Sequence, residues 1–151
     1  MQEFLVEHMS AFDLFTKLPL FDCLSQEDLM QLIPKIALDF EDVPNGHILY
    51  KTGTTCKRVV YLLKGRVSLR SGSTDRTVHA PALLVHAELF RTGKKHAFTA
   101  QAQEDSSLMY VDEVSFMFML RNHSTFLNQY LHKMIHLLPE HTTTVLTTTN
   151  K

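Results

Sequence analysis

Histidine, lysine and glutamate side chains gather in one stretch of the sequence, residues 80–102. A short helix-like segment and a turn at Gly93 lie within this stretch, between two strand-like runs. Lys94, Lys95 and His96 follow the turn directly, and their cationic or hydrogen-bonding groups suit a ligand that carries a carboxylate or another anionic group. We therefore predict that this stretch cradles a small anionic ligand.

The histidines of this region are also candidates for metal ligands. A cupin-type site would use His79, His86, Glu88 and His96, but these residues lack the closely spaced His-x-His pair that places two ligands on one strand face. The sequence also lacks a Gly-rich phosphate loop, a nucleophile elbow and a pair of catalytic acids. We therefore expect no metal site and no enzymatic activity.

The composition is that of an ordinary globular domain. A chain of 151 residues with 44% hydrophobic and 21% charged residues suits one folded domain. No apolar run reaches the roughly 18 residues of a membrane span, and Glu3 and Glu7 are unlike the start of a signal peptide. Cys23 and Cys56 lie far apart without a CxxC motif, which indicates free thiols. We expect a cytoplasmic protein that does not contact membranes.

The net charge of −1 conceals an uneven distribution. Residues 1–42 hold nine acids and two lysines, whereas residues 57–96 hold nine bases and two acids. The basic middle of the chain could attract an anionic ligand or partner. Alternatively, Lys64, Arg66 and Arg70 alternate along a strand and simply face solvent.

Two helices are predicted near the N-terminus. The first follows apolar residues at helical spacing and ends before a Lys-Leu-Pro sequence; these residues are Leu5, Met9, Phe12 and Phe15. Ser25 precedes two acids and should cap the second helix. Leu29 and Met30 of this helix are expected in the core.

From Ile36 onwards the apolar residues form short runs separated by turn signals. The runs cover residues 36–40, 48–50, 59–63, 67–69, 98–102 and 107–111. Six or more short strands at this spacing predict an antiparallel sandwich or barrel with jelly-roll connections.

Two further helices are predicted after the strands, over residues 114–120 and from Ser124 onwards. In the second helix a 4-3-4 spacing typical of a two-stranded coiled-coil seam relates Leu127, Leu131, Met134 and Leu138. Other residues of this helix could pack on its own barrel: Phe126, Tyr130 and Ile135. The seam predicts a homodimer, and the alternative is a helix that packs only on its own domain. Pro139 should kink or end the helix before a Thr-rich tail.

These features resemble the cyclic-nucleotide-binding sensor domain of Crp/Fnr transcription regulators. The N-terminal helices of that family are similar to LPLFDCLSQEDLMQLI, and its glycine-punctuated strands to PNGHILYKTGTTCKRVVYLLKGRVSL, with Gly46, Gly53 and Gly65 at the expected turns. The resemblance covers residues 14–138. It implies a mainly β fold with flanking helices, a jelly-roll barrel with N-terminal helices and a C-terminal dimerisation helix.

The resemblance also implies a division of the chain. Residues 1–120 would form the effector domain, and residues 121–151 the dimerisation helix and the Thr-rich tail. Family members bind DNA through a helix-turn-helix domain that follows this helix, and this chain contains no such domain. We therefore expect no sequence-specific DNA binding by this chain alone.

In the family, a Gly-Glu pair at the start of a short helix and an Arg after the following turn bind the cyclic phosphate. Matched through Leu89-Phe90, this chain has Val85-His86 in place of Gly-Glu and His96-Ala97 in place of Arg-Ser or Arg-Thr. The resemblance thus implies a cradle that has lost its phosphate contacts. The candidate ligand-binding residues are Val85, His86, Ala87, Glu88, Leu89, Lys95, His96 and Ala97.

We predict that the chain is the ligand-sensing and dimerisation domain of a Crp/Fnr-like regulator. Its effector would be a small molecule, best matched by an anion, rather than cyclic AMP bound in the usual way. If His96 faces that ligand, binding should strengthen as the pH falls through the imidazole pKa, near roughly 6.5 when unperturbed.

Three alternatives stay open at this point. The chain could be a free-standing small-molecule-binding module, or a haem-binding module, because some Crp/Fnr relatives hold haem and His and Met are plentiful here. A cupin-like metalloenzyme is the third. The cofactor is unknown, and an absorption spectrum with and without added haem would test the second alternative.

Overall fold

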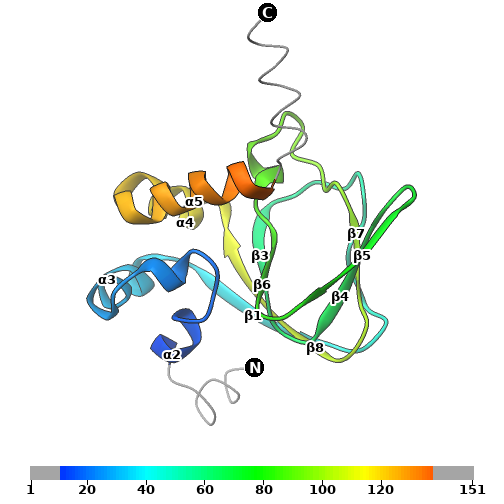
Figure 1. The fold of residues 1–151 in the computed structure, drawn as a ribbon, viewed down its shortest axis with the longest axis horizontal. Helices are drawn as coiled ribbons and strands as arrows, with labels where there is room; N and C mark the ends of the chain where they lie inside the picture. The colour runs from blue at the N-terminus through cyan, green and yellow to red at the C-terminus, as the bar shows by residue number, and fades with distance from the viewer. Residues whose placement is uncertain (1–10, 138–151) are drawn as a thin grey trace, which may run out of the picture.

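The structure, a computed structural model, describes residues 11–137 and consists of two four-stranded sheets with helices on one side (Figure 1). All strand pairs are antiparallel, in the orders β1-β8-β3-β6 and β2-β7-β4-β5. The strands are β1 (Leu38–Val43), β2 (Ile48–Tyr50), β3 (Arg58–Lys64), β4 (Arg66–Ser71), β5 (Thr74–His79), β6 (Ala82–Val85), β7 (Thr99–Ala102) and β8 (Ser106–Asp112). The predicted mainly β jelly-roll fold is confirmed.

The helices gather beside the β1-β8-β3-β6 sheet, and α4 contacts both β3 and β8 (Figure 1). They are α2 (Ala11–Phe15), η1 (Phe21–Cys23), α3 (Gln26–Leu32), η2 (Ile33–Lys35), η3 (Ala87–Phe90), α4 (Glu113–Asn122) and α5 (Ser124–Leu137). The first helix was predicted from residues 5–16, and its part before Ala11 lies outside the described residues. None of the helices between residues 11 and 137 combines the length and hydropathy that crossing a bilayer requires.

Helix α3 begins as predicted, at a Ser25 cap. The Ser25 hydroxyl accepts the Asp28 backbone N–H at 3.1 Å, and the Asp28 carboxylate accepts the Ser25 N–H at 3.3 Å, which completes a capping box. Leu29 is fully buried, but Met30 is 58% exposed. The prediction that Met30 lies in the core is wrong, because the buried face of this short helix carries Leu29 and Leu32 and the next position along turns outwards.

Aromatic side chains fasten the helices to the sheet. The Phe21 ring lies 4.8 Å from Phe15, 5.6 Å from Tyr61 and 5.7 Å from Phe126, measured between ring centroids. The Tyr61 hydroxyl donates to the Pro19 carbonyl at 2.8 Å. Because all four rings are buried, the helices and the sandwich share one core, and the burial of this apolar area stabilises their arrangement.

Strand β5 is the strand that the sequence did not reveal. It pairs with β4 alone and forms one edge of its sheet. Most of its residues are polar and exposed, and only Val78 is half-buried. An edge strand that faces solvent on most sides needs no alternating apolar pattern, so the periodicity that marks the other strands is missing here.

Helix α5 packs on its own barrel through the residues predicted for that role. Phe126 and Tyr130 are buried, whereas Leu127 and Met134 are partly buried against the same core. Leu131 is 52% exposed. The side chain of Ile135 and all of Leu138 lie outside the part of the structure that is described.

Candidate functional site

The predicted pair Val85-His86 directly precedes the short helix η3. Val85 is fully buried as the last residue of β6, where it pairs with Val60 of β3, and His86 is the N-cap. The pair that opens the helix is therefore Ala87-Glu88. That Val85-His86 stands in place of the family's Gly-Glu pair stays a prediction.

A cavity of about 250 Å³ lies between η3 and the strands of both sheets, and we refer to it as the η3 cavity. Its lining residues are Leu69, Arg76, Val78, Leu83, Leu84, His86, Ala87, Glu88, Arg91, Ala97 and Phe98. Of the predicted ligand-binding residues, the lining includes His86, Ala87, Glu88 and Ala97. It does not include Val85, Leu89, Lys95 or His96.

Two cations and one carboxylate line the η3 cavity. Arg76 comes from β5, where its guanidinium carbon lies 5.4 Å from the centre of the Phe98 ring, and Arg91 follows η3. The Glu88 side chain is buried and accepts the backbone N–H of Ala97 at 3.5 Å. The excess of positive charge favours an anion. Neither arginine was among the ligand-binding residues predicted from the sequence. Arg76 lies on β5, which was not predicted as a strand. Arg91 lies within residues 80–102, so its charge was the signal that could have identified it.

His86 connects η3 with helix α5. Its Nδ1 lies 3.2 Å from the Tyr130 hydroxyl, and the two rings meet edge to face at 5.5 Å. Burial lowers the pKa of His86 to about 4, and the nearby charges of Lys133 and Arg91 add to this effect. The ring is therefore neutral at pH 7. Phe90 of η3 also lies 5.8 Å from the Tyr130 ring, so two side chains at η3 contact one residue of α5.

An ion pair connects the turn after η3 with helix α4. The Lys94 ammonium donates to both carboxylate oxygens of Glu113, at 2.9 and 2.7 Å. Glu113 is the first residue of α4, where a negative charge also interacts favourably with the helix dipole. Lys94 thus holds the turn in place and does not line the η3 cavity.

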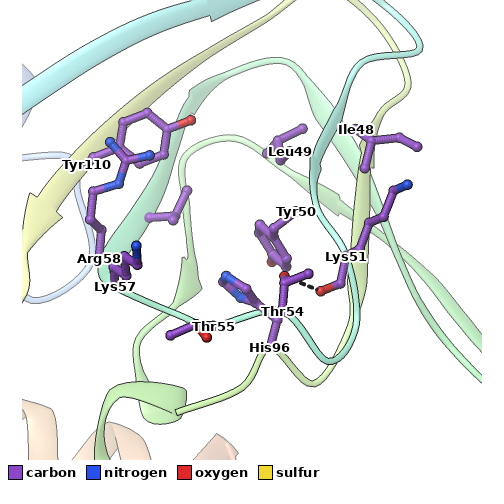
Figure 2. A pocket seen from close by; sticks show the side chains of 11 residues that line it. Ile48, Leu49, Tyr50, Lys51, Thr54, Thr55, Lys57, Arg58, His96 and Tyr110 are labelled. Atoms are coloured by element: carbon purple, nitrogen blue, oxygen red, sulfur yellow. Dashed lines mark hydrogen bonds between the residues drawn. The ribbon is translucent and has the colours of Figure 1, made fainter.

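Among the three residues after the turn, His96 is the one that faces inwards, as predicted, but it faces a different cavity. Its ring stacks on Tyr50 with 4.1 Å between centroids, and both rings line a second cavity of about 540 Å³, which we call the Tyr50 cavity (Figure 2). The His96 N–H donates to the Thr54 carbonyl at 2.8 Å, and the His96 carbonyl accepts the Gly53 N–H at 2.9 Å. These bonds fix the backbone from which the ring projects.

Metal-binding side chains do not converge between residues 11 and 137: no three His, Cys, Asp or Glu residues of this part lie close enough to hold a metal ion. Cys23 and Cys56 are free thiols. The described residues therefore offer no geometry in favour of the cupin-like alternative.

The sequence matches the profile of the cyclic nucleotide-binding domain over residues 40–123, more than half of the chain. The chain belongs to the cyclic nucleotide-binding domain family. A search of curated proteins gives no match. The η3 cavity of this cyclic nucleotide-binding domain lies within the matched residues.

Several solved structures share the fold of this cyclic nucleotide-binding domain. The sensor domain of the transcriptional regulator DNR from Pseudomonas aeruginosa is 20% identical, with 85% of this chain and 94% of that chain covered and a TM-score of 0.72. The catabolite activator protein of Thermus thermophilus is 16% identical, with coverages of 87% and 63% and a TM-score of 0.69. The N-terminal domain of a Streptomyces coelicolor A3(2) transcriptional regulator is 19% identical, with coverages of 88% and 95% and a TM-score of 0.65. The likeness establishes a shared fold.

Proposed function

We propose that this chain is the effector-sensing and dimerisation domain of a Crp/Fnr-like transcription regulator, with a small anion bound in the η3 cavity as its effector. The family and the regulator-like neighbours support the sensor role. The observation that carries the choice of ligand is that two arginines, Arg76 and Arg91, and only one carboxylate, Glu88, line the same small cavity.

Arginine suits this role because its guanidinium stays charged and offers parallel hydrogen bonds to a carboxylate or a phosphate. Arg76 and Arg91 would thus supply the contacts that His96, which lines the Tyr50 cavity, does not supply. Glu88 is the second residue of η3 and would accept a hydrogen bond from a hydroxyl or amine group of the ligand. The neutral His86 adds no charge at pH 7.

The η3 cavity is smaller than most ligand pockets. Its volume of about 250 Å³ is below the roughly 300–1,000 Å³ of most ligand pockets. Ala97 also lacks the hydroxyl that the Crp/Fnr pattern places after its arginine. We therefore expect that the domain does not bind cyclic AMP in the usual mode.

Dimerisation would occur through α5. Leu131 is exposed on this helix, although the neighbouring Phe126 and Tyr130 are buried in the core. A twofold pair of helices would bury Leu131 symmetrically. The contacts of His86 and Phe90 with Tyr130 would let an effector at η3 influence the helix pair.

Isothermal titration calorimetry tests the effector proposal. Cyclic AMP should give no saturable heat below millimolar concentration, whereas a panel of small carboxylates and phosphates should contain a ligand. For that ligand, Arg76→Gln and Arg91→Gln should each weaken binding by about tenfold or more, because each removes a charged hydrogen bond.

The matched control is Arg70→Gln. Arg70 is an exposed arginine of β4 that donates to Gln101 and lines neither the η3 cavity nor the Tyr50 cavity. This variant should bind as the parent does. Tight binding of cyclic AMP, or equal affinities in all three variants, would contradict the proposal.

A further inference from the structure

The Tyr50 cavity is separate from the η3 cavity, and none of its lining residues lines the other. Strand β2 and the loop after it form one wall, and the start of β3 with Tyr110 of β8 forms the opposite wall (Figure 2). Its volume of about 540 Å³ lies within the usual range of small-molecule sites. The cavity is therefore large enough for a ligand of its own.

His96 is a mostly buried histidine that lines this cavity. The residue is 7% exposed, and its Nδ1 is buried without a hydrogen-bond partner among the described residues. Buried polar atoms without a partner are uncommon in folded proteins. Burial lowers the pKa of His96 although the charge of Glu88 opposes this, so the neutral ring has one donor and one acceptor nitrogen. Nδ1 itself is closed off from the cavity, so a bound molecule with a polar group would form its hydrogen bond with the other ring nitrogen of His96, Nε2.

Cations surround the opening of the Tyr50 cavity. Lys51, Lys57 and Arg58 all line it, and the lining contains no carboxylate. The Arg58 guanidinium lies 3.7 Å from the centre of the Tyr110 ring and makes a loose 3.8 Å contact with Asp39 of β1. Because these groups are exposed, they can turn towards an incoming anion. The ligand should therefore carry a negative charge.

The remaining lining of the Tyr50 cavity is apolar or aromatic. Leu49 and Val60 contribute aliphatic surface, and the rings of Tyr50 and Tyr110 stand on opposite walls (Figure 2). Such a lining favours a flat apolar body between the charged opening and the His96 ring.

From these features we infer that the Tyr50 cavity binds a small aromatic carboxylate. The carboxylate would lie among Lys51, Lys57 and Arg58, the ring beside Tyr50, and a polar substituent within hydrogen-bonding distance of His96. This site is additional to the effector site proposed at η3 and does not depend on it.

The probe for this inference is 4-hydroxybenzoate, titrated into the full chain by calorimetry and by ¹⁵N NMR. Benzoate lacks the hydroxyl, and 4-hydroxybenzamide lacks the charge. We expect 4-hydroxybenzoate to show saturable binding. The affinity for 4-hydroxybenzamide should be lower by a factor of about ten or more. Lys57→Gln should weaken the binding of both 4-hydroxybenzoate and benzoate. His96→Phe keeps an aromatic ring on Tyr50 and should abolish the advantage of 4-hydroxybenzoate over benzoate.

Two controls separate this site from the rest of the molecule. Lys35→Gln changes an exposed lysine of η2, and Arg76→Gln changes the η3 cavity; both should bind 4-hydroxybenzoate as the parent does. Thermal midpoints verify that each variant is folded. The inference is overturned if no saturable binding occurs at millimolar concentration. It is equally overturned if Arg76→Gln weakens binding while Lys57→Gln does not, a result that would place the acid in the η3 cavity.

Discussion

His86 lies where the η3 cavity meets helix α5, and the environment of its ring determines its charge. The side chain is 7% exposed and shares a hydrogen bond with the Tyr130 hydroxyl. Burial lowers its pKa to about 4, compared with 6.5 for an ordinary histidine. At a pH between these two pKa values, the His86 ring is protonated in the unfolded chain but not in the folded chain. Acid therefore favours unfolding.

We predict that the free energy of unfolding falls as the pH is lowered from about 6.5 to about 4. The contribution of His86 can reach about 3 kcal/mol, because each unit of pKa difference corresponds to about 1.4 kcal/mol. Urea denaturation at pH 7 and pH 4.5 measures the change. His86→Asn should lose much of the pH dependence, and the exposed His47→Gln should keep it. If the free energy of unfolding depended on pH equally in His86→Asn and in the parent, folding would not lower the pKa of His86.

Individual residues of the η3 cavity were only partly predictable from the sequence. The stretch that contains His86, Glu88 and Ala97 was recognised, but Val85, another predicted ligand-binding residue, is fully buried at the end of β6 and does not line the cavity. Arg76 lies on the edge strand β5, and its approach to η3 depends on how the two sheets face each other. Sequence spacing carries no information of that kind.

At the scale of elements, the sequence predicted the regular parts of the fold well. The six predicted strands and the helix starting at Ser25 are present because local periodicity and capping encode them. The exceptions are an edge strand with little apolar surface and Met30, whose orientation depends on which side of a short helix the barrel covers. Both exceptions depend on tertiary contacts, which local patterns do not contain.

The turn between β3 and β4 gives a test at this scale. Gly65 has φ +105°, and a Cβ there would clash with the Ser106 hydroxyl and lie 2.9 Å from the Ser106 Cα. Gly65→Ala should therefore lower the free energy of unfolding by about 2–3 kcal/mol through strain and displacement of β8. Gly72→Ala is the control, because Gly72 has φ +58° with open space around it and should cost about 1 kcal/mol. Chemical denaturation of both variants checks the difference, and equal costs would contradict it.

At the scale of the whole molecule, the exposed Leu131 on α5 underlies the proposed dimer. We predict that Leu131→Lys yields monomers in light scattering, because a twofold interface would bring two lysine charges together in an apolar seam. Gln129→Lys, at another exposed position of α5, should leave the dimer intact. A monomeric parent, or an unchanged mass for Leu131→Lys, would contradict the seam and favour a helix that packs only on its own barrel.

The sheet orders leave four edge strands among the described residues: β1, β6, β2 and β5. Unpaired strand edges promote aggregation when they are long, flat and apolar. Here β2 has only three residues, β1 carries the acids Asp39, Glu41 and Asp42, and β5 carries Asp75 and Arg76. A second β1 laid against the first would bring carboxylates together. The edges formed by β1, β2 and β5 therefore oppose fibril growth through the sheets, whereas the proposed twofold contact through α5 would close on itself without extending into a polymer.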